Sequence, residues 1–189
     1  MANKLLTVAA LAVGGYLLSK QLNKPQQSGD PSSVRETIEV DVPLSTAYNQ
    51  WTQFEEFPLF MESVHEVRQL DDKHLHWRAD VAGKEVHWHS EITEQIPDKR
   101  IAWRSTGGPP NAGIVSFKKI SDSKTAITLQ MDYDPQTVTE KIGDALGFVT
   151  LQTKSNLKRF KELLESRGRE TGAWRGTVAP GSGKPVLPH

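Results

Sequence analysis

The chain of 189 residues predicts an α+β fold, in which a curved antiparallel sheet of about seven strands wraps around a long C-terminal helix and two short helices follow the first strand. Three observations support this prediction. Strand-like segments succeed one another across short turns, an aromatic-rich segment interrupts them once, and the hydrophobic period becomes helical near the C-terminus. A strongly twisted antiparallel sheet curls, so one helix on its concave side leaves room for a bulky core or a pocket.

Composition limits the partners and the chemistry. A hydrophobic fraction of 37% with 24% charged residues is typical of one soluble domain with tails. Lysine plus arginine equals aspartate plus glutamate at 23 each, so we expect no nucleic-acid partner. The absence of cysteine excludes disulfides and sulfur-based zinc sites, and we expect no cofactor. We divide the chain into a hydrophobic segment and polar linker (1–33), a folded domain (34–168) and a flexible tail rich in glycine and proline (169–189).

The N-terminal segment differs in composition from the rest. Lys4 precedes an uncharged run from Leu5 to Leu18, which as a helix would measure about 21 Å against the roughly 30 Å of a bilayer core. We interpret it first as a retained membrane anchor or interfacial helix. An inefficient signal peptide and a helix docked on the protein or a partner are the alternatives. The prediction is a membrane-associated protein that is otherwise cytoplasmic, of unknown oligomeric state.

The first strand and first helix are predicted from alternation and capping. Residues Val34 to Val42 alternate between apolar and polar side chains, and Pro43 ends the strand. Ser45 is the expected N-cap of the following helix.

Five aromatic residues then occur at every third position: Tyr48, Trp51, Phe54, Phe57 and Phe60. Three residues fall about 60° short of a helical turn, so one continuous helix would leave some rings in water. Pro58 disfavours the helical conformation at the residue before it and can begin a second helix. We therefore predict two short helices meeting near Pro58, with every ring buried in the core or closing a cavity.

Six further strands and one long helix complete the predicted domain. The strand-like segments run from Val64 to Leu70, His74 to Val81, Glu85 to Ile96, Arg100 to Ser105, Gly113 to Ile120 and Thr125 to Tyr133. From about Gln136 to Arg167 the apolar residues follow a helical period, and Gly168 is the expected stop. Trp174 could attach the start of the tail to the domain.

A family resemblance rests on three segments, TIEVDVPLSTAYNQWTQFEEFPLFMESV, LHWRADVAGKEVHWHSEITEQIPDKRIAWRS and LKRFKELLESRG. They resemble the START-like or Bet v 1-like (SRPBCC) superfamily, and within it the bacterial polyketide cyclase/dehydrase and coenzyme-Q-binding-like branch. The resemblance covers about Val34 to Gly168. It implies a helix-grip fold with a hydrophobic cavity between sheet and long helix, used across the superfamily for lipids, quinones, polyketides or steroids.

The alternation of side chains between the two faces of each strand gives the candidate ligand contacts. A two-residue turn at Ala82-Gly83 would pair Val81 with Lys84, and therefore Trp77 with Trp88 on one face. These inward-facing apolar side chains could fill the core as readily as they could line a ligand site. The candidates that we name for ligand binding are Phe57, Phe60, Met61, Trp77, Trp88, Trp103, Phe117, Met131, Tyr133 and Leu146. Trp51 and Phe54 are expected to support the core.

The opposite face of the same hairpin carries four histidines: His74, His76, His87 and His89. Two H-x-H pairs on adjacent strands are weak candidates for zinc or nickel ligands. A solvated outer face is the interpretation we favour, because Arg78 beside His87 would repel a cation.

The leading functional prediction is binding or transfer of a small hydrophobic ligand, such as a lipid, a quinone or a polyketide-like compound. The same alternation places few polar groups on the inward face of the sheet. The weak catalytic candidates among them are Tyr133, Ser90 and Ser105. They form no nucleophile–base pair, so we name no catalytic residue. The alternatives are a polyketide-type cyclase or dehydratase that acts by orienting its substrate, and a protein-interaction module.

Overall fold

The computed structural model describes residues 33–81, 83–133 and 145–180. The chain divides into two units, residues 1–30 and 31–189, and every described element belongs to the second. The segment from Leu5 to Leu18 therefore lies outside the described residues. The elements, in chain order, are β1 (Ser33–Val40), α2 (Leu44–Trp51), the 3-10 helix η1 (Phe54–Leu59), β2 (Val64–Gln69), β3 (His74–Val81), β4 (Lys84–Ile96), β5 (Arg100–Gly107), β6 (Asn111–Ser121), β7 (Lys124–Tyr133) and α4 (Ala145–Arg167).

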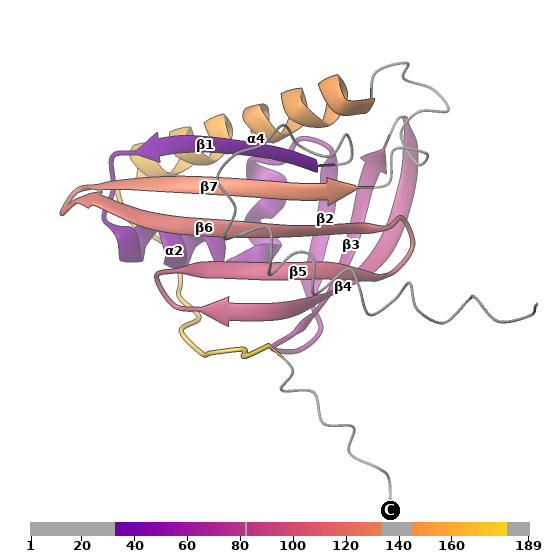
Figure 1. Cartoon of the computed structure of the whole chain (residues 1–189), viewed down its shortest axis with the longest axis horizontal. Coiled ribbons are helices and arrows are strands. Elements are labelled where there is room, and N and C mark those ends of the chain that lie inside the picture. The colour runs from indigo at the N-terminus through magenta and orange to yellow at the C-terminus, as the bar shows by residue number, and fades with distance from the viewer. Residues whose placement is uncertain (1–32, 82, 134–144, 181–189) are drawn as a thin grey trace, which may run out of the picture. The chain divides into compact units, whose positions relative to one another are not determined.

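The seven strands form one antiparallel sheet in the order β1-β7-β6-β5-β4-β3-β2 (Figure 1). Strands β2 to β7 are joined as successive hairpins, whereas β1 pairs with β7 at one edge and β2 lies at the other. The chain must therefore cross the sheet between its first two strands, and α2 and η1 make that crossing. The predicted α+β class, strand number and helix-grip arrangement are confirmed.

The predicted register of the β3–β4 hairpin is correct. Val81 pairs with Lys84 and Trp77 with Trp88. Gly83 has a φ of 77°, in the left-handed region that glycine enters without steric cost. The turn therefore specifies which face of the hairpin each side chain occupies.

Two details of the helices after β1 differ from the prediction. Pro43, not Ser45, is the N-cap of α2, and its carbonyl accepts the first helical hydrogen bond from Ala47 at 3.1 Å. The break between the helices lies at Thr52 and Gln53, while Pro58 lies inside η1. Thr52 ends the helix because its Oγ1 donates to the carbonyl of Asn49 at 2.6 Å.

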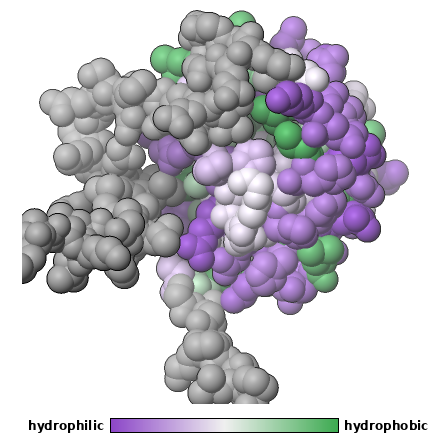
Figure 2. Space-filling view, turned by 90° about the vertical axis from the view of Figure 1, so that its right-hand side faces the viewer, coloured by the Kyte–Doolittle hydropathy of each residue, from purple (hydrophilic) through white to green (hydrophobic). Residues whose placement is uncertain are grey.

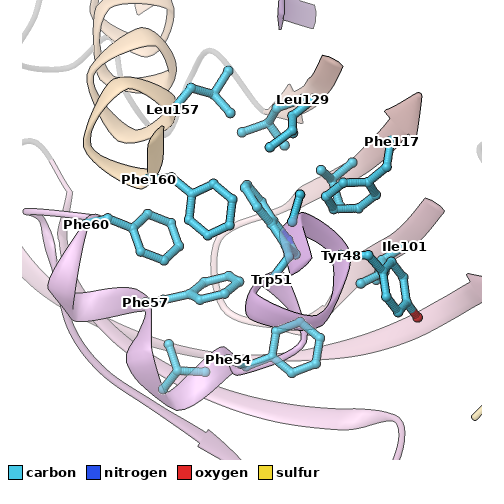
Figure 3. Close-up of a cluster of buried hydrophobic side chains, with 14 of the residues drawn as sticks. Tyr48, Trp51, Phe54, Phe57, Phe60, Ile101, Phe117, Leu129, Leu157 and Phe160 are labelled. Atoms are coloured by element: carbon cyan, nitrogen blue, oxygen red, sulfur yellow. The ribbon is translucent and has the colours of Figure 1, made fainter. Parts of the chain in front are cut away.

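The apolar side of the fold is turned inward. Figure 2 views the end of the domain that lies on the right in Figure 1, and its surface is mainly hydrophilic where it is not drawn grey. Among the described residues, the exposed large hydrophobic side chains are scattered over several segments: Leu59, Leu70, Ile120, Leu146 and Leu151. The aromatic residues of α2 and η1 are instead buried, as predicted (Figure 3).

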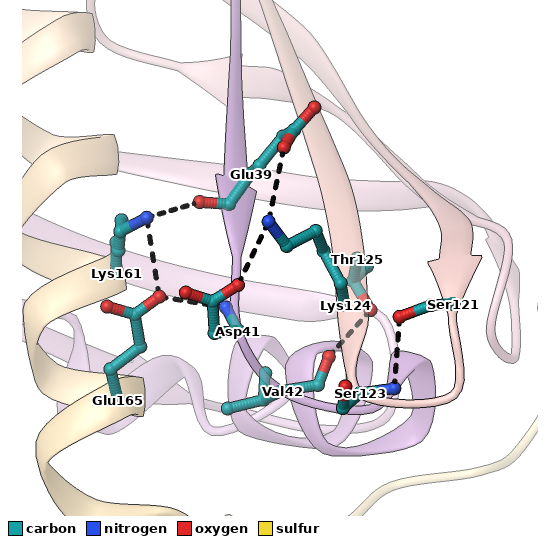
Figure 4. Close-up of polar contacts among 9 residues, drawn as sticks. All are labelled: Glu39, Asp41, Val42, Ser121, Ser123, Lys124, Thr125, Lys161 and Glu165. Atoms are coloured by element: carbon teal, nitrogen blue, oxygen red, sulfur yellow. Dashed lines mark hydrogen bonds and ion pairs between the residues drawn. The ribbon is translucent and has the colours of Figure 1, made fainter.

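Polar contacts attach the C-terminal half of α4 to the end of β1 (Figure 4). The backbone N–H of Asp41 donates to Glu165 at 2.8 Å, and Lys161 donates to the carbonyl of Glu39 at 2.8 Å. Lys124, at the start of β7, lies 3.2 Å from the carboxylate of Asp41. Helix α4 ends as predicted at Gly168, which has a φ of 65°. The predicted helical residues 136–144 lie outside the described part of the chain.

Residues 169–180 correct the prediction of a flexible tail beginning at 169. This segment runs back over the domain, where Val178 is buried and forms a β-bridge with Gln95. Arg175 forms an ion pair with Asp98 and donates to Asn49 Oδ1 at 2.8 Å. Trp174 attaches the segment to the domain, because its backbone N–H donates to Thr52 Oγ1 at 3.0 Å. Residues 181–189 of the predicted tail lie outside the described residues.

We expect Glu56→Gln to change the acid sensitivity of the fold. Burial alone would raise the pKa of Glu56, but hydrogen bonds from Arg167, Thr171 and Gln50 outweigh it and hold the pKa below its usual range. Stability from this carboxylate is present above its unfolded-state pKa and lost as pH falls through the lower folded-state pKa. The variant should be about 1–2 kcal/mol less stable at pH 7, with the difference shrinking below about pH 4.

Urea denaturation of both proteins from neutral to acidic pH measures this difference. A deficit that stays constant across the pH range would show that the charge of Glu56 does not cause it.

Candidate functional site

A cavity of about 220 Å³ lies among the concave face of the sheet, the crossing helices and the first turns of α4, and it is partly open to solvent. The crossing segment contributes apolar side chains to its wall: Trp51, Phe54, Phe57 and Met61. The sheet contributes three tryptophans together with aliphatic side chains and Met131. Helix α4 contributes Phe148 and Val149. The wall is therefore predominantly aromatic and apolar, as in sites for hydrophobic small molecules.

Three tryptophans contribute aromatic rings to the sheet side of the cavity. The rings of Trp77 and Trp88 are parallel within 5°, with centroids 5.5 Å apart. Trp77 Nε1 donates to the fully buried Ser90 Oγ at 2.8 Å, which fixes the ring orientation. Trp103 lies across Gly113, its partner on β6, where a Cβ atom would collide with the indole. We call these three residues the tryptophan wall.

The crossing helices are held under the cavity by aromatic contacts around Trp51 (Figure 3). Its ring centroid lies 4.8 Å from Phe160 of α4, 5.6 Å from Phe57 and 6.2 Å from Phe117 of β6, each in an edge-to-face arrangement. The ring centroid of Phe60 lies 4.8 Å from that of Phe160, and Phe60 does not line the cavity. Edge-to-face pairs contribute about 0.5–1.5 kcal/mol each beyond area burial, so this cluster is a rigid support.

Polar groups occupy a limited part of the cavity lining. Gln152 Nε2 donates to Ser63 Oγ at 2.5 Å, and Asn156 lies one turn further along α4. Tyr133 and Asn111 lie where β7 ends and β6 begins. The loop before β6 contributes Pro109 and Pro110 to the lining. These groups can orient a carbonyl or a hydroxyl, but they contain no nucleophile paired with a base.

The structure places most of the predicted ligand contacts on the cavity wall: Phe57, Met61, Trp77, Trp88, Trp103, Met131 and Tyr133. Three others do not line it. Phe60 and Phe117 are buried in the aromatic cluster around Trp51, and Leu146 is 44% exposed on α4. Of the three weak catalytic candidates, only Tyr133 reaches the lining. Ser90 accepts the Trp77 hydrogen bond, and Ser105 accepts one from the backbone of Asn111 at 3.1 Å.

Sequence reasoning missed several lining residues. Trp51 and Phe54 were assigned only to core support, yet they also line the cavity. Phe148, Gln152 and Asn156 on α4 were not named, although their spacing of four places them on one helical face. That face could have been found from the same period that predicted the helix.

The histidines lie on the opposite face of the β3–β4 hairpin from the tryptophan wall. His76 lies opposite His89, with ring centroids 5.1 Å apart, as the predicted register required. Burial, with help from Arg68 and the neighbouring imidazoles, lowers the pKa of His76. His74 bonds to Asp71, and His87 to Glu85. Within residues 33–81, 83–133 and 145–180, no group of three or more histidine or acidic side chains is placed to hold a metal ion.

Comparison with known proteins identifies the family. Residues 40–162 match the family described as polyketide cyclase/dehydrase and lipid transport, which covers more than half of the chain. The chain belongs to this family. It is also 54% identical over 148 residues to an uncharacterized 17.2 kDa protein from the melC2-rnhH intergenic region of Streptomyces lincolnensis, covering 78% of this chain and 99% of that protein.

Solved structures agree with the polyketide cyclase/dehydrase and lipid transport fold. The Zhui aromatase/cyclase from Streptomyces sp. R1128 has a TM-score of 0.62 at 17% identity, covering 75% of this chain and 98% of that one. A START superfamily protein from Mycobacterium smegmatis has a TM-score of 0.57 at 14% identity, covering 71% and 95%. The family match, together with the fold of these structures, confirms the predicted START-like superfamily.

None of these comparisons bears on coenzyme Q binding or on membrane association. Among the helices that the structure describes, none combines the length and apolar character that a membrane crossing requires.

Gly113→Ala should distort the tryptophan wall. The new methyl group would collide with the Trp103 indole and approach the carbonyl of Gln130 at 2.9 Å, so the ring must move. We expect a loss of about 1–3 kcal/mol in stability and a shift in tryptophan emission. Thermal unfolding and fluorescence spectra measure both. Gly107→Ala is the matched control, because a Cβ there meets nothing within 4 Å; equal effects of the two substitutions would contradict the role of Gly113.

Proposed function

We propose that the domain binds a small hydrophobic ligand in the cavity between the sheet and α4. The observation that carries this proposal is the cavity itself, walled by the tryptophans of the sheet and the aromatic residues of the crossing helices. Burial of an apolar ring against such a surface contributes about 25 cal/mol per Å² removed from water. Membership of a family that includes lipid transport supports the same function.

The cavity volume limits the size of the enclosed part of the ligand. An apolar cavity of about 150 Å³ accommodates one benzene ring, so about 220 Å³ has room for a bicyclic ring system or a short acyl segment. A quinone head group, a cyclised polyketide unit or part of a lipid chain meets this limit. A longer chain would extend through the open side. Membrane association through Leu5 to Leu18 stays a separate prediction.

Organic extraction of the purified protein, followed by mass spectrometry, tests this function most directly. We expect an apolar compound in about stoichiometric amount. The emptied protein should then bind the neutral fluorescent probe N-phenyl-1-naphthylamine, with an increase in probe emission. Absence of both a copurified compound and probe binding would show that the protein does not use the cavity for ligands.

Trp88→Ala should weaken probe binding about tenfold, because it removes half of the parallel indole pair. Probe titration of the folded variant measures the change. Trp174→Ala is the matched control: this tryptophan packs against the core from the C-terminal segment and does not line the cavity. If the control weakens probe binding as much as Trp88→Ala does, the probe emission does not report binding in the cavity.

Cyclase or dehydratase activity is the second candidate, favoured by the position of Tyr133, a residue with a hydroxyl group, in the cavity lining. The family description includes cyclase/dehydrase, and the similar Zhui structure is an aromatase/cyclase. Such an activity would accelerate ring closure by holding a reactive chain in a folded conformation, with Tyr133 donating to a carbonyl oxygen.

If the protein is a cyclase, Tyr133→Phe should slow cyclisation of a linear poly-β-ketone substrate about 10- to 100-fold while the fold persists. Product formation is followed by liquid chromatography. Tyr48→Phe is the control, since Tyr48 is fully buried outside the cavity and accepts a hydrogen bond from Gln95 at 3.1 Å. A rate no higher than that of the buffer for the wild-type protein would favour binding alone.

A further inference from the structure

One face of α4 turns from apolar to polar where it borders the cavity. Phe148, Val149, Gln152, Thr153 and Asn156 all line it, at the spacing of a single helical face. The first two are apolar, whereas the last three carry amides and a hydroxyl. We call Gln152, Thr153 and Asn156 the polar strip. These residues line the same cavity as the tryptophan wall on the sheet. The cavity thus has an aromatic side and an uncharged polar side.

The hydrogen-bond partners of the strip show which atoms remain available. Thr153 Oγ1 donates to the carbonyl of Val149 at 2.8 Å, so its hydroxyl is used within the helix. Gln152 donates to Ser63 through Nε2, which leaves its Oε1 without a partner among the described residues. The side-chain amide of Asn156, which is half-buried, has no hydrogen-bond partner among the described residues. Two amide groups can therefore bond to a molecule in the cavity.

The charge of the lining argues against an anionic ligand. Among the described lining residues the only charged side chain is Asp80, which is 52% exposed and bonds to His65 at 3.0 Å. No arginine or lysine of the described lining faces the amides. A carboxylate placed there would lose its hydration and gain no opposite charge.

We propose that the cavity selects a neutral bicyclic ring compound carrying an oxygen substituent, and this rests on the proposed ligand-binding function. The rings lie against the tryptophan wall. The oxygen accepts a hydrogen bond from the Asn156 amide, and a hydroxyl at the same position also donates to Gln152 Oε1. Asn156 and Gln152 are then the residues that determine specificity.

Equilibrium dialysis of the full chain with three naphthalene compounds at pH 7 tests this selectivity. Naphthalene reports burial of the rings alone, 2-naphthol adds a neutral oxygen, and 2-naphthoate adds a charge. We expect 2-naphthol to bind about three- to tenfold more tightly than naphthalene, the gain typical of one net hydrogen bond. We expect 2-naphthoate to bind at least about tenfold more weakly than 2-naphthol, because its charge is desolvated without a partner.

Substitutions on α4 assign the selectivity to the amides. Asn156→Leu and Gln152→Leu should each bring the two neutral compounds closer in affinity, and the double substitution should bring them within about twofold of each other. Ser155→Leu is the matched control, because it adds the same side chain to the same helix at an exposed position outside the cavity; it should keep the wild-type ratio.

The wild-type measurements decide the matter even if a variant does not fold. Naphthalene binding without a preference for 2-naphthol would overturn the selectivity and leave the proposed function standing. Binding of 2-naphthoate as tight as that of 2-naphthol would overturn the selection against charge. Failure of all three compounds to bind would overturn both the selectivity and the proposed function for aromatic ligands.

Discussion

The packing of Trp51 against aromatic rings from three other elements is the interaction on which the rest of the domain depends. The first two strands lie at opposite edges of the sheet, so the chain between them must cross beneath it. Contacts of Trp51 with Phe57, Phe117 and Phe160 join that crossing segment to the sheet and to the long helix. Helix α4 contacts the sheet most extensively at β1, on one edge, so these aromatic contacts connect the helix to the crossing segment and to β6 as well. Trp51 and Phe57 of this cluster also form part of the cavity wall.

Local chemistry was sufficient to predict most of the framework. The alternation of side chains and the glycine at the β3–β4 turn predicted that Trp77 and Trp88 would share a face, because a two-residue turn allows one register. The prediction of a helix break at Pro58 is wrong, because Pro58 lies inside η1, which begins after Gln53. The true break at Thr52 depends partly on Trp174, more than a hundred residues away in sequence. Contacts between residues so far apart leave no local pattern in the sequence.

The residues of the candidate site were likewise only partly predictable from local sequence patterns. The alternation of side chains along the strands identified the sheet residues of the cavity. It could not distinguish buried rings that line the cavity from rings that pack only against other rings, such as Phe60. Periodicity identified α4, but part of the helix face that borders the cavity is polar, and a search for apolar residues passes over Gln152 and Asn156. An amide on the buried side of an amphipathic helix is costly without a partner. In a ligand-binding domain, such a residue points to the part of the ligand that is not hydrophobic.

The pairing of β1 with β7 has a consequence for the order in which the chain folds. Thr37 bonds to Thr128 across a separation of 91 residues, so the edge strand made first has no partner until the last strand has been synthesised. Domains dominated by such distant contacts fold slowly, because the loop must close before its contacts form. During translation, the five aromatic residues between Tyr48 and Phe60 leave the ribosome before the strands and helix that cover them. The segment that stabilises the finished domain is thus the one most in need of protection from aggregation while the protein is being made.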